Sequence, residues 1–321
     1  MNSSILKTAA DPARLAQTAV AAVLLVVIGL SALPAAGQAQ KSFATPEEAV
    51  KALVSAAKAE NMEELLAILG PEAKDVLSSG DPVADRLNRQ VVLTAFDQQW
   101  KLEEEVSGVK TVVIGYEDWP LPIPLVKEES GWRFDTAAGK EEILFRRIGR
   151  NELNTIQACR MYVQVQNEYA SRGHDGMPEG LFAQKFASDP GKQNGLYWPA
   201  KPGEPLSPLG EFVAEASSEG YLREGTNPNP APRPFHGYYF RILTAQGPAA
   251  PGGAQSYVVN GNMTGGFALV AWPAEYGNSG IMTFIVNHDG IVYEKDSGED
   301  TAAIASQMKD YNPDDTWRKA E

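Results

Sequence analysis

A long helical pattern of apolar residues in the middle of the chain constrains the fold more than any other feature. The pattern begins near Lys140 and continues to Tyr169, so we predict one long helix that ends near 171–173, with Gly149 as the point of interruption. The apolar positions are Ile143, Leu144, Ile148, Leu153, Ile156, Cys159, Met161, Tyr162, Val165 and Tyr169. We expect this helix to pack on an antiparallel sheet formed by the strands that follow it.

The residues before the long helix predict three shorter helices and then antiparallel strands. Thr45 is a helix N-cap, with Pro46 in the first turn and Glu48 completing a capping box. Helical patterns cover 45–57, 62–69 and 82–99, and the second one stops at Gly70. Strand patterns cover 109–116, 121–127 and 132–134, and the prolines of the middle strand suit an edge or a bulge.

The residues after the long helix predict a second sheet. A proline-rich loop at 199–235 contains one short helix at 209–219. Strand patterns follow at 238–245, 255–260, 266–272, 281–286 and 291–294, and a last helix covers 301–309. The Asp289-Gly290 pair joins the last two strands as a hairpin. The predicted fold class is therefore α+β, with an N-terminal α+β domain at 40–148 and a C-terminal one at 149–321.

The first 39 residues have the order of a signal peptide. Lys7 and Arg14 precede an apolar run, and small residues up to Ala39 follow it. Cleavage after Ala39 would leave a protein of the periplasm or the extracellular space with no membrane contact. The alternative is that 15–36 stays in place as an anchor, because the run is about long enough to span a bilayer.

Composition excludes several classes of protein. The chain has 41 acidic and 28 basic residues and a net charge of -13, which argues against a nucleic-acid binder. Its single cysteine excludes an intramolecular disulfide, a four-cysteine zinc site and an iron–sulfur cluster. An apolar fraction of 43% argues against disorder throughout. We predict no cofactor.

Two groups of residues are candidates for ligand binding. Arg146, Arg147 and Arg150 form a compact basic cluster, which either holds an anion or pairs with acidic residues across the domain junction. Three tryptophans precede proline, and aromatic rings beside carboxylates can form a sugar- or peptide-binding face. The alternative is that these Trp-Pro pairs are rigid loop ends packed on a core. The predicted site residues are Asp118, Trp119, Trp132, Arg146, Arg147, Arg150, Trp272 and Tyr276.

Residues with catalytic or metal-binding chemistry are few. His174, His236 and His288 all fall in predicted loops, are not spaced as metal ligands and are expected to be solvated. No Gly-x-Ser-x-Gly elbow is present to carry a serine nucleophile. Cys159 lies on the apolar stripe and is predicted to be a buried structural thiol. The loop with Asp175 and Glu179 has too few carboxylates for calcium, and no metal site is predicted.

Several stretches match a bacterial exported family known as domain of unknown function 2950, which the chain resembles over nearly its whole length after the signal peptide. The matching runs are Phe43-Ala-Thr-Pro-Glu-Glu-Ala49, Ser78-Ser-Gly-Asp-Pro82, Gly131-Trp-Arg-Phe-Asp135, Gly139-Lys-Glu-Glu-Ile143, Arg147-Ile-Gly-Arg-Asn-Glu-Leu153, Gly237-Tyr-Tyr-Phe-Arg-Ile-Leu-Thr-Ala-Gln-Gly247, Gly266-Phe-Ala-Leu-Val-Ala-Trp-Pro-Ala-Glu-Tyr-Gly277 and Thr283-Phe-Ile-Val-Asn287. This resemblance implies no activity.

Each half of the chain also resembles a known fold. Helices followed by strands that end in Gly131-Trp-Arg-Phe-Asp135 are similar to the cone-shaped fold of nuclear transport factor 2 relatives. The long helix and the runs Gly237-Tyr-Tyr-Phe240, Ala271-Trp-Pro273, Thr283-Phe284 and Asp289-Gly290 resemble the globular head of type IV pilin-like proteins. Fold similarity by itself does not transfer function.

Three functions compete at this point. The leading hypothesis is a non-catalytic binding or assembly module of the cell envelope, whose partner is an envelope glycan or another exported protein. The second is an extracytoplasmic enzyme with Glu117, Asp118 or Asp135 as acid or base in a pocket of the N-terminal domain. The third is a minor pilin-like component of a pilus or a secretion system.

Overall fold

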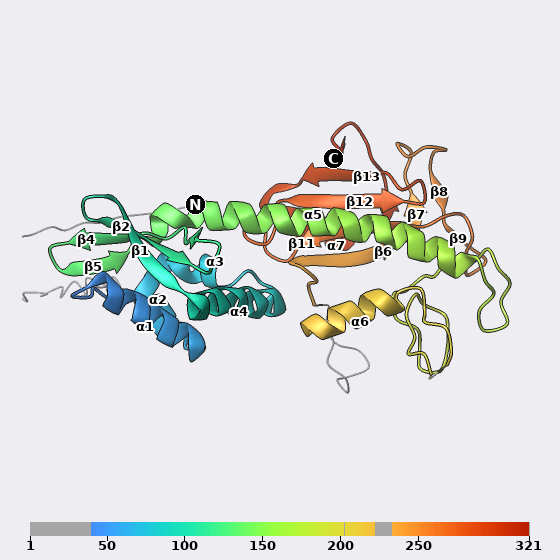
Figure 1. Ribbon diagram of the computed structural model, residues 1–321. Helices are drawn as coiled ribbons and strands as arrows, with labels where there is room; N and C mark the ends of the chain where they lie inside the picture. The colour runs from blue at the N-terminus through green and yellow to red at the C-terminus, as the bar shows by residue number, and fades with distance from the viewer. Residues whose placement is uncertain (1–39, 202, 222–232, 321) are drawn as a thin grey trace, which may run out of the picture. The chain divides into compact units, whose positions relative to one another are not determined.

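The computed structural model describes residues 40–201, 203–221 and 233–320, which lie in one compact unit. The predicted signal peptide at 1–39 and part of the proline-rich loop are outside these residues. Helices and mainly antiparallel sheets alternate along the chain, so the fold class is α+β as predicted (Figure 1). The division of the chain at 148–149 stays a prediction.

The N-terminal helices follow the capping and spacing signals of the sequence. They are α1 (Pro46–Lys58), α2 (Met62–Leu69), the short turns η1 (Pro71–Ala73) and α3 (Lys74–Leu77), and α4 (Pro82–Gln98). The Glu48 amide donates to Oγ1 of Thr45 at 3.2 Å, which confirms the predicted cap of α1. The predictions for α1, α2 and α4 are confirmed, whereas η1 and α3 were not predicted.

The first sheet is built from β1 (Trp100–Val106), β2 (Val109–Ile114), β3 (Trp119–Pro120), β4 (Leu125–Glu128) and β5 (Gly131–Phe134). The strand order is β1-β2-β4-β5, with β3 paired to β2, and all pairs are antiparallel. The predicted strand at 121–127 is wrong at its start, because β4 begins only after Pro122 and Pro124, which lack the N–H of a ladder. The buried residues of this first sheet form one core with those of α1 and α2.

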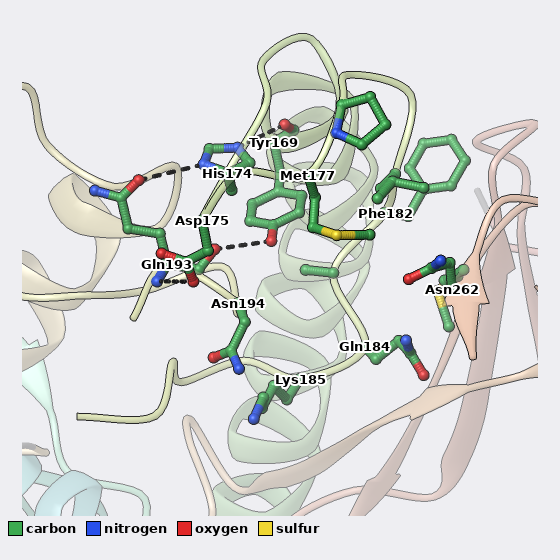
Figure 2. Close-up of a pocket in the computed structure, with 14 residues that line it drawn as sticks. Tyr169, His174, Asp175, Met177, Phe182, Gln184, Lys185, Gln193, Asn194 and Asn262 are labelled. Atoms are coloured by element: carbon green, nitrogen blue, oxygen red, sulfur yellow. Dashed lines mark hydrogen bonds between the residues drawn. The ribbon is translucent and has the colours of Figure 1, made fainter. Parts of the chain in front are cut away.

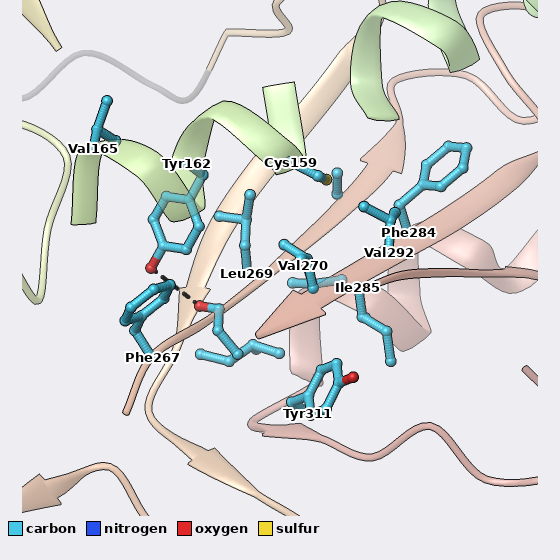
Figure 3. Packing of buried hydrophobic residues seen from close by; sticks show 14 of the residues in the cluster. Cys159, Tyr162, Val165, Phe267, Leu269, Val270, Phe284, Ile285, Val292 and Tyr311 are labelled. Carbon is cyan, nitrogen blue, oxygen red and sulfur yellow. Dashed lines mark hydrogen bonds between the residues drawn. The ribbon is translucent and has the colours of Figure 1, made fainter. Parts of the chain in front are cut away.

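Helix α5 (Thr136–Ala170) is continuous over 35 residues. The predicted interruption at Gly149 does not occur, and a side chain at that position would meet open space. Cys159 and Tyr162 face the second sheet, where the Tyr162 hydroxyl donates to the Ala268 carbonyl at 3.3 Å (Figure 3). The predicted end of the helix is confirmed, with Ser171 as the C-cap.

The second sheet has the order β15-β13-β12-β11-β6 and is antiparallel throughout. Its strands are β6 (Tyr238–Leu243), β11 (Ala268–Pro273), β12 (Met282–Asn287), β13 (Val292–Asp296) and β15 (Arg318–Lys319). The Asp-Gly hairpin is confirmed by the pairing of Val286 with Val292. Successive residues of β11 are buried, and both α5 and α7 (Thr301–Gln307) contact this strand, which accounts for burial on its two faces.

Smaller elements complete the fold. They are α6 (Gly210–Glu219), β7 (Ala245–Gln246), β8 (Gln255–Ser256), β9 (Val258–Val259), β10 (Asn262–Met263), the turn η2 (Gly298–Asp300) and β14 (Asp310–Tyr311). The strand predicted at 255–260 is therefore two short strands. The Val258 amide donates to Oγ of Ser256 at 3.2 Å, and β9 pairs with β10 instead of continuing β8.

A set of buried polar side chains, which we name the polar junction, ties the segment 75–85 to the C-terminal part of the chain. The junction consists of Asp81, Arg147, Tyr221 and Asn278, each no more than 8% exposed. The Arg147 guanidinium donates to the carbonyls of Asp75 and Val76 and to Oδ1 of Asn278 at 2.5–2.6 Å. The Asn278 amide donates in turn to the Ser78 carbonyl at 2.9 Å.

The second half of the polar junction is centred on the Asp81 carboxylate. Oδ1 of Asp81 accepts from the amides of Val83 and Ala84 at 3.1 Å and so caps α4. Oδ2 accepts from the Tyr221 hydroxyl and from the Gly237 amide, both at 2.9 Å. Four donors thus converge on one buried carboxylate, which satisfies it without a cation.

Candidate functional site

A cavity of about 360 Å³ opens at the C-terminal end of α5 (Figure 2). We name it the amide pocket, because four primary amide side chains line it together with polar and apolar neighbours. Its labelled lining residues are Tyr169, His174, Asp175, Met177, Phe182, Gln184, Lys185, Gln193, Asn194 and Asn262. The volume lies within the range of small-molecule sites.

The first wall of the amide pocket is a turn that stacks back on α5. The His174 ring lies 4.1 Å from the Tyr169 ring at an interplanar angle of 17°. Nε2 of His174 lies 2.9 Å from the Tyr169 carbonyl, and Nδ1 lies 3.5 Å from Oε1 of Gln193. The edge of Trp198 covers both rings at centroid distances of 5.4 and 6.4 Å. These contacts hold the turn in one position before any ligand arrives.

The Gln193 segment is tied to the same turn by two further bonds. The Tyr169 hydroxyl donates to the backbone carbonyl of Gln193 at 2.8 Å, and the backbone N–H of Gln193 donates to Oδ2 of Asp175 at 2.7 Å. Asp175 has a positive φ of 51°, which an Asp tolerates better than most residues. Burial raises the pKa of the Tyr169 phenol, so this hydroxyl remains a neutral donor.

The opposite wall is pinned to α5 by a buried glutamine. Gln166 accepts from the Ala183 amide at 2.9 Å and donates to the Ala183 carbonyl at 2.8 Å. These two bonds to the backbone of Ala183 resemble those between neighbouring strands. The adjacent residue Phe182 lies beside β10. The Phe182 amide donates to the Met263 carbonyl at 2.9 Å, and the Phe182 ring packs against Phe267.

Several polar groups of the amide pocket remain open to a ligand. Gln184 donates through Nε2 to the Gly261 carbonyl, which leaves its oxygen available as an acceptor. The side chain of Asn262 makes no hydrogen bond within the described ranges. The Lys185 ammonium is paired with Asp189 at 2.7 Å, so it brings little net charge. Such a lining suits a neutral polar ligand.

The predicted aromatic–carboxylate site is not assembled in one place. Asp118 is exposed at the turn before β3, where the Lys101 ammonium lies 3.0 Å from it, and Trp119 is exposed as the first residue of β3. Trp132 is instead buried in the first core. Trp272 is half-buried against Tyr239, at a centroid distance of 5.8 Å. None of these residues lines the amide pocket.

Tyr276 and the arginine cluster also have separate roles. The Tyr276 hydroxyl donates to Asp296 at 3.0 Å on the surface. Arg146 pairs with Glu142 on its own helix at 2.6 Å, whereas Arg147 is buried in the polar junction. Arg150 is exposed and has no ion pair among the described residues. The alternative in which the cluster pairs with acidic residues across the domain junction is not met by Arg146 or by Arg147, because Arg146 pairs within α5 and Arg147 donates to two carbonyls and to Oδ1 of Asn278.

The carboxylates of the enzyme hypothesis do not converge. Glu117 and Asp118 are exposed to solvent. Asp135 lies 3.8 Å from the Arg133 guanidinium, with its side chain 32% exposed. Asp118 and Asp135 each have a basic neighbour, Lys101 and Arg133, but no cavity of the described residues brings any of the three carboxylates together as an acid–base pair.

The histidine prediction is partly wrong. All three lie in loops or turns, and His288 is exposed as expected. His174 and His236 are half-buried instead of being solvated; His174 stacks on Tyr169, and His236 makes an edge-on contact with Phe235. Across the described ranges, no group of three or more His, Cys, Asp or Glu side chains is placed to hold a metal ion. No described helix is long and apolar enough to cross a membrane.

Cys159 is predicted to resist alkylation in the folded protein. It is fully buried on the side of α5 that faces the second sheet, and burial raises the pKa of its thiol to about 12, so almost no thiolate forms at pH 8. We expect no iodoacetamide adduct by mass spectrometry under native conditions and complete labelling in denaturant. Rapid labelling of the folded protein would contradict this prediction.

Sequence reasoning missed the residues that form the amide pocket. It treated His174 and Asp175 as parts of a loop and of a poor calcium motif, and it gave no role to the amides. The available signal was weak, namely polar amides close to Trp198 and to the end of the long helix. The pocket is assembled by distant contacts, such as that of Phe182 with Met263, which no local spacing records.

Comparison with known proteins assigns the family. A family model described as "Protein of unknown function (DUF2950)" matches residues 40–320, and the chain belongs to this family. A search of curated proteins found no match. A search of solved structures found none either.

Four of the sequence runs that carry the family resemblance supply contacts of the polar junction. Asp81 comes from the run 78–82, Arg147 from 147–153, and the Gly237 amide from 237–247. The run 266–277 ends just before Asn278 and includes Glu275, which accepts from the Asn278 amide at 2.8 Å. These runs therefore serve the fold, whereas the amide pocket draws most of its lining from other parts of the chain.

Proposed function

We propose that this protein is a non-catalytic binding module of the cell envelope that holds a neutral saccharide in the amide pocket. The observation that carries the proposal is the convergence of Gln184, Gln193, Asn194 and Asn262 on one cavity. A primary amide offers both donors and an acceptor, which matches sugar hydroxyls that donate and accept at once. Among the described residues, Asn262 has both kinds of group free and Gln184 has its oxygen free, whereas both ends of the Asn194 amide already bond to Asp189. The envelope location rests on the predicted signal peptide at 1–39.

The apolar part of the lining supports the same ligand class. Met177 is 43% exposed at the mouth of the cavity, and Phe182 is half-buried beside it. A sugar ring has apolar C–H faces as well as hydroxyls, so it can use both kinds of surface. The paired Lys185 and the engaged Asp175 leave no strong charge to favour an ionic ligand.

The non-catalytic part of the proposal rests on the state of the polar groups. Nε2 of His174 lies 2.9 Å from the Tyr169 carbonyl, and Nδ1 lies 3.5 Å from Oε1 of Gln193. Both ring nitrogens are therefore engaged in contacts that position the turn. Asp175 is the single carboxylate of the lining, whereas glycoside hydrolysis ordinarily uses a pair. Binding without turnover is therefore what this geometry supports.

The proposal predicts saturable binding of sugars by the purified protein in calorimetric titrations. The probes are N-acetylglucosamine, its β-1,4-linked disaccharide and cellobiose. Asn262→Ala and Gln184→Ala should each weaken the affinity of the sugar that binds by about fivefold to tenfold, the cost of one lost hydrogen bond. The matched control is Gln157→Ala, since Gln157 is an exposed amide on α5 without a hydrogen bond among the described residues.

Two results would contradict the proposal. One is the absence of saturable binding for every probe. The other is an equal loss of affinity in the Gln157→Ala control, which would show that binding does not depend on the amide pocket.

A further inference from the structure

A second cavity, of about 340 Å³, lies between α1, the end of α4 and the start of β1, far from the amide pocket along the chain. We name it the lysine groove. Its apolar lining is Val50, Val54, Phe96 and Trp100, and its polar lining is Lys51, Ser55, Lys58 and Asp97. The groove shares no residue with the amide pocket.

The floor of the lysine groove is apolar. Val50 and Phe96 are 1% and 6% exposed and belong to the first core. Val54 and Trp100 are half-buried and extend the same surface to the solvent. Water in the groove therefore contacts hydrocarbon, and its release by an apolar ligand is favourable.

The rim carries positive charge in a chain whose net charge is -13. Lys51 is exposed and has no ion pair within the described residues. Lys58 pairs with Asp97 at 2.6 Å, and this ion pair joins α1 to α4 at the other end of the groove. Lys51 is thus available to bind an anion, whereas the charge of Lys58 is already neutralised by Asp97.

We propose that the lysine groove binds a medium-chain fatty acid, with its carboxylate on Lys51 and its hydrocarbon chain along Val54 toward Trp100. Lys51 and Lys58 are seven residues apart, which is about 10 Å along α1. The Lys58–Asp97 ion pair lies at the far end of that span. The groove is therefore only about 10 Å long, which suits a short hydrocarbon chain better than a peptide helix. The charge of Lys51 selects the acid over a neutral lipid.

The first test compares ligands by calorimetry on the purified protein. Decanoate should bind about fivefold more tightly than decanol, because only the acid can pair with Lys51. Shortening the acid by one methylene should weaken binding by about fourfold, the effect of one buried methylene. Equal affinity for decanoate and decanol, or no binding of either, would overturn the proposal.

The second test compares two lysines of the same groove. Lys51→Gln should weaken decanoate binding by about fivefold, whereas Lys58→Gln should change it by less than twofold. Both side chains are exposed, so neither change threatens folding, which circular dichroism can verify. Equal effects of the two changes would place the carboxylate elsewhere and overturn the proposal. Binding to phosphatidylglycerol vesicles without binding to decanoate would do the same, by assigning the groove to a lipid surface.

Discussion

Replacing Asp81 with alanine is expected to lower the free energy of unfolding by about 3 kcal/mol, as measured by urea denaturation followed by circular dichroism. The change removes the N-cap of α4, which contributes about 1 kcal/mol. It also leaves the Tyr221 hydroxyl and the Gly237 amide without their acceptor, and each buried donor without a partner costs about 1 kcal/mol or more.

A matched control separates the cap from the long-range contacts. Asn61 caps α2 by accepting from the Glu64 amide at 3.0 Å, and its side chain is exposed. Asn61→Ala should therefore cost only about 1 kcal/mol. If Asp81→Ala costs no more than Asn61→Ala, the bonds to Tyr221 and Gly237 do not stabilise the fold, and the polar junction has been misjudged.

Replacing Arg147 with methionine should have a comparable effect, a loss of about 3 kcal/mol in the same assay. Methionine fills much of the same volume but leaves two carbonyls, of Asp75 and Val76, and Oδ1 of Asn278 without a donor. The control is Arg146→Met, one residue away on α5. Arg146 makes an exposed pair with Glu142, so its replacement should cost no more than about 0.5 kcal/mol.

The cost of Arg147→Met should also depend on pH. Burial raises the pKa of Asp85, and the positive charge of Arg147 opposes that rise. Without Arg147 the pKa of Asp85 rises further. A carboxyl whose pKa is higher in the folded than in the unfolded protein makes the fold less stable as the pH rises above the pKa of the unfolded state. The variant should therefore lose more stability at pH 7 than at pH 4, and the opposite trend would contradict the assigned role of Arg147.

Local signals in the sequence were enough to predict most helices and the C-terminal hairpin. The Thr45 cap, the Gly70 stop and the Asp289-Gly290 turn depend only on neighbouring residues, so they can be recognised without tertiary contacts. The long helix was predictable for the same reason, because its apolar stripe repeats over many turns. The prediction for Gly149 was wrong because α5 makes tertiary contacts both before and after this residue, through Arg147 and Tyr162, and these outweigh the weak helix propensity of one glycine.

Elements that depend on distant contacts were not predictable. β1 has a mostly polar sequence and becomes a strand because it pairs with β2 along its length. The polar junction joins residues up to 200 positions apart, such as Ser78 and Asn278. The amide pocket likewise draws its lining from separate segments, whereas the candidates chosen for their aromatic or charged character lie apart from one another.

The most direct test of the central claim, saccharide binding in the amide pocket, is a nuclear magnetic resonance titration that follows side-chain amide signals. The sugar with the highest calorimetric affinity is the probe. We predict that the signals of Gln184, Gln193, Asn194 and Asn262 shift together with one saturation curve, while that of Gln157 stays fixed. Shifts confined to other residues, such as those around Trp119, or no shifts at saturating sugar would contradict the claim.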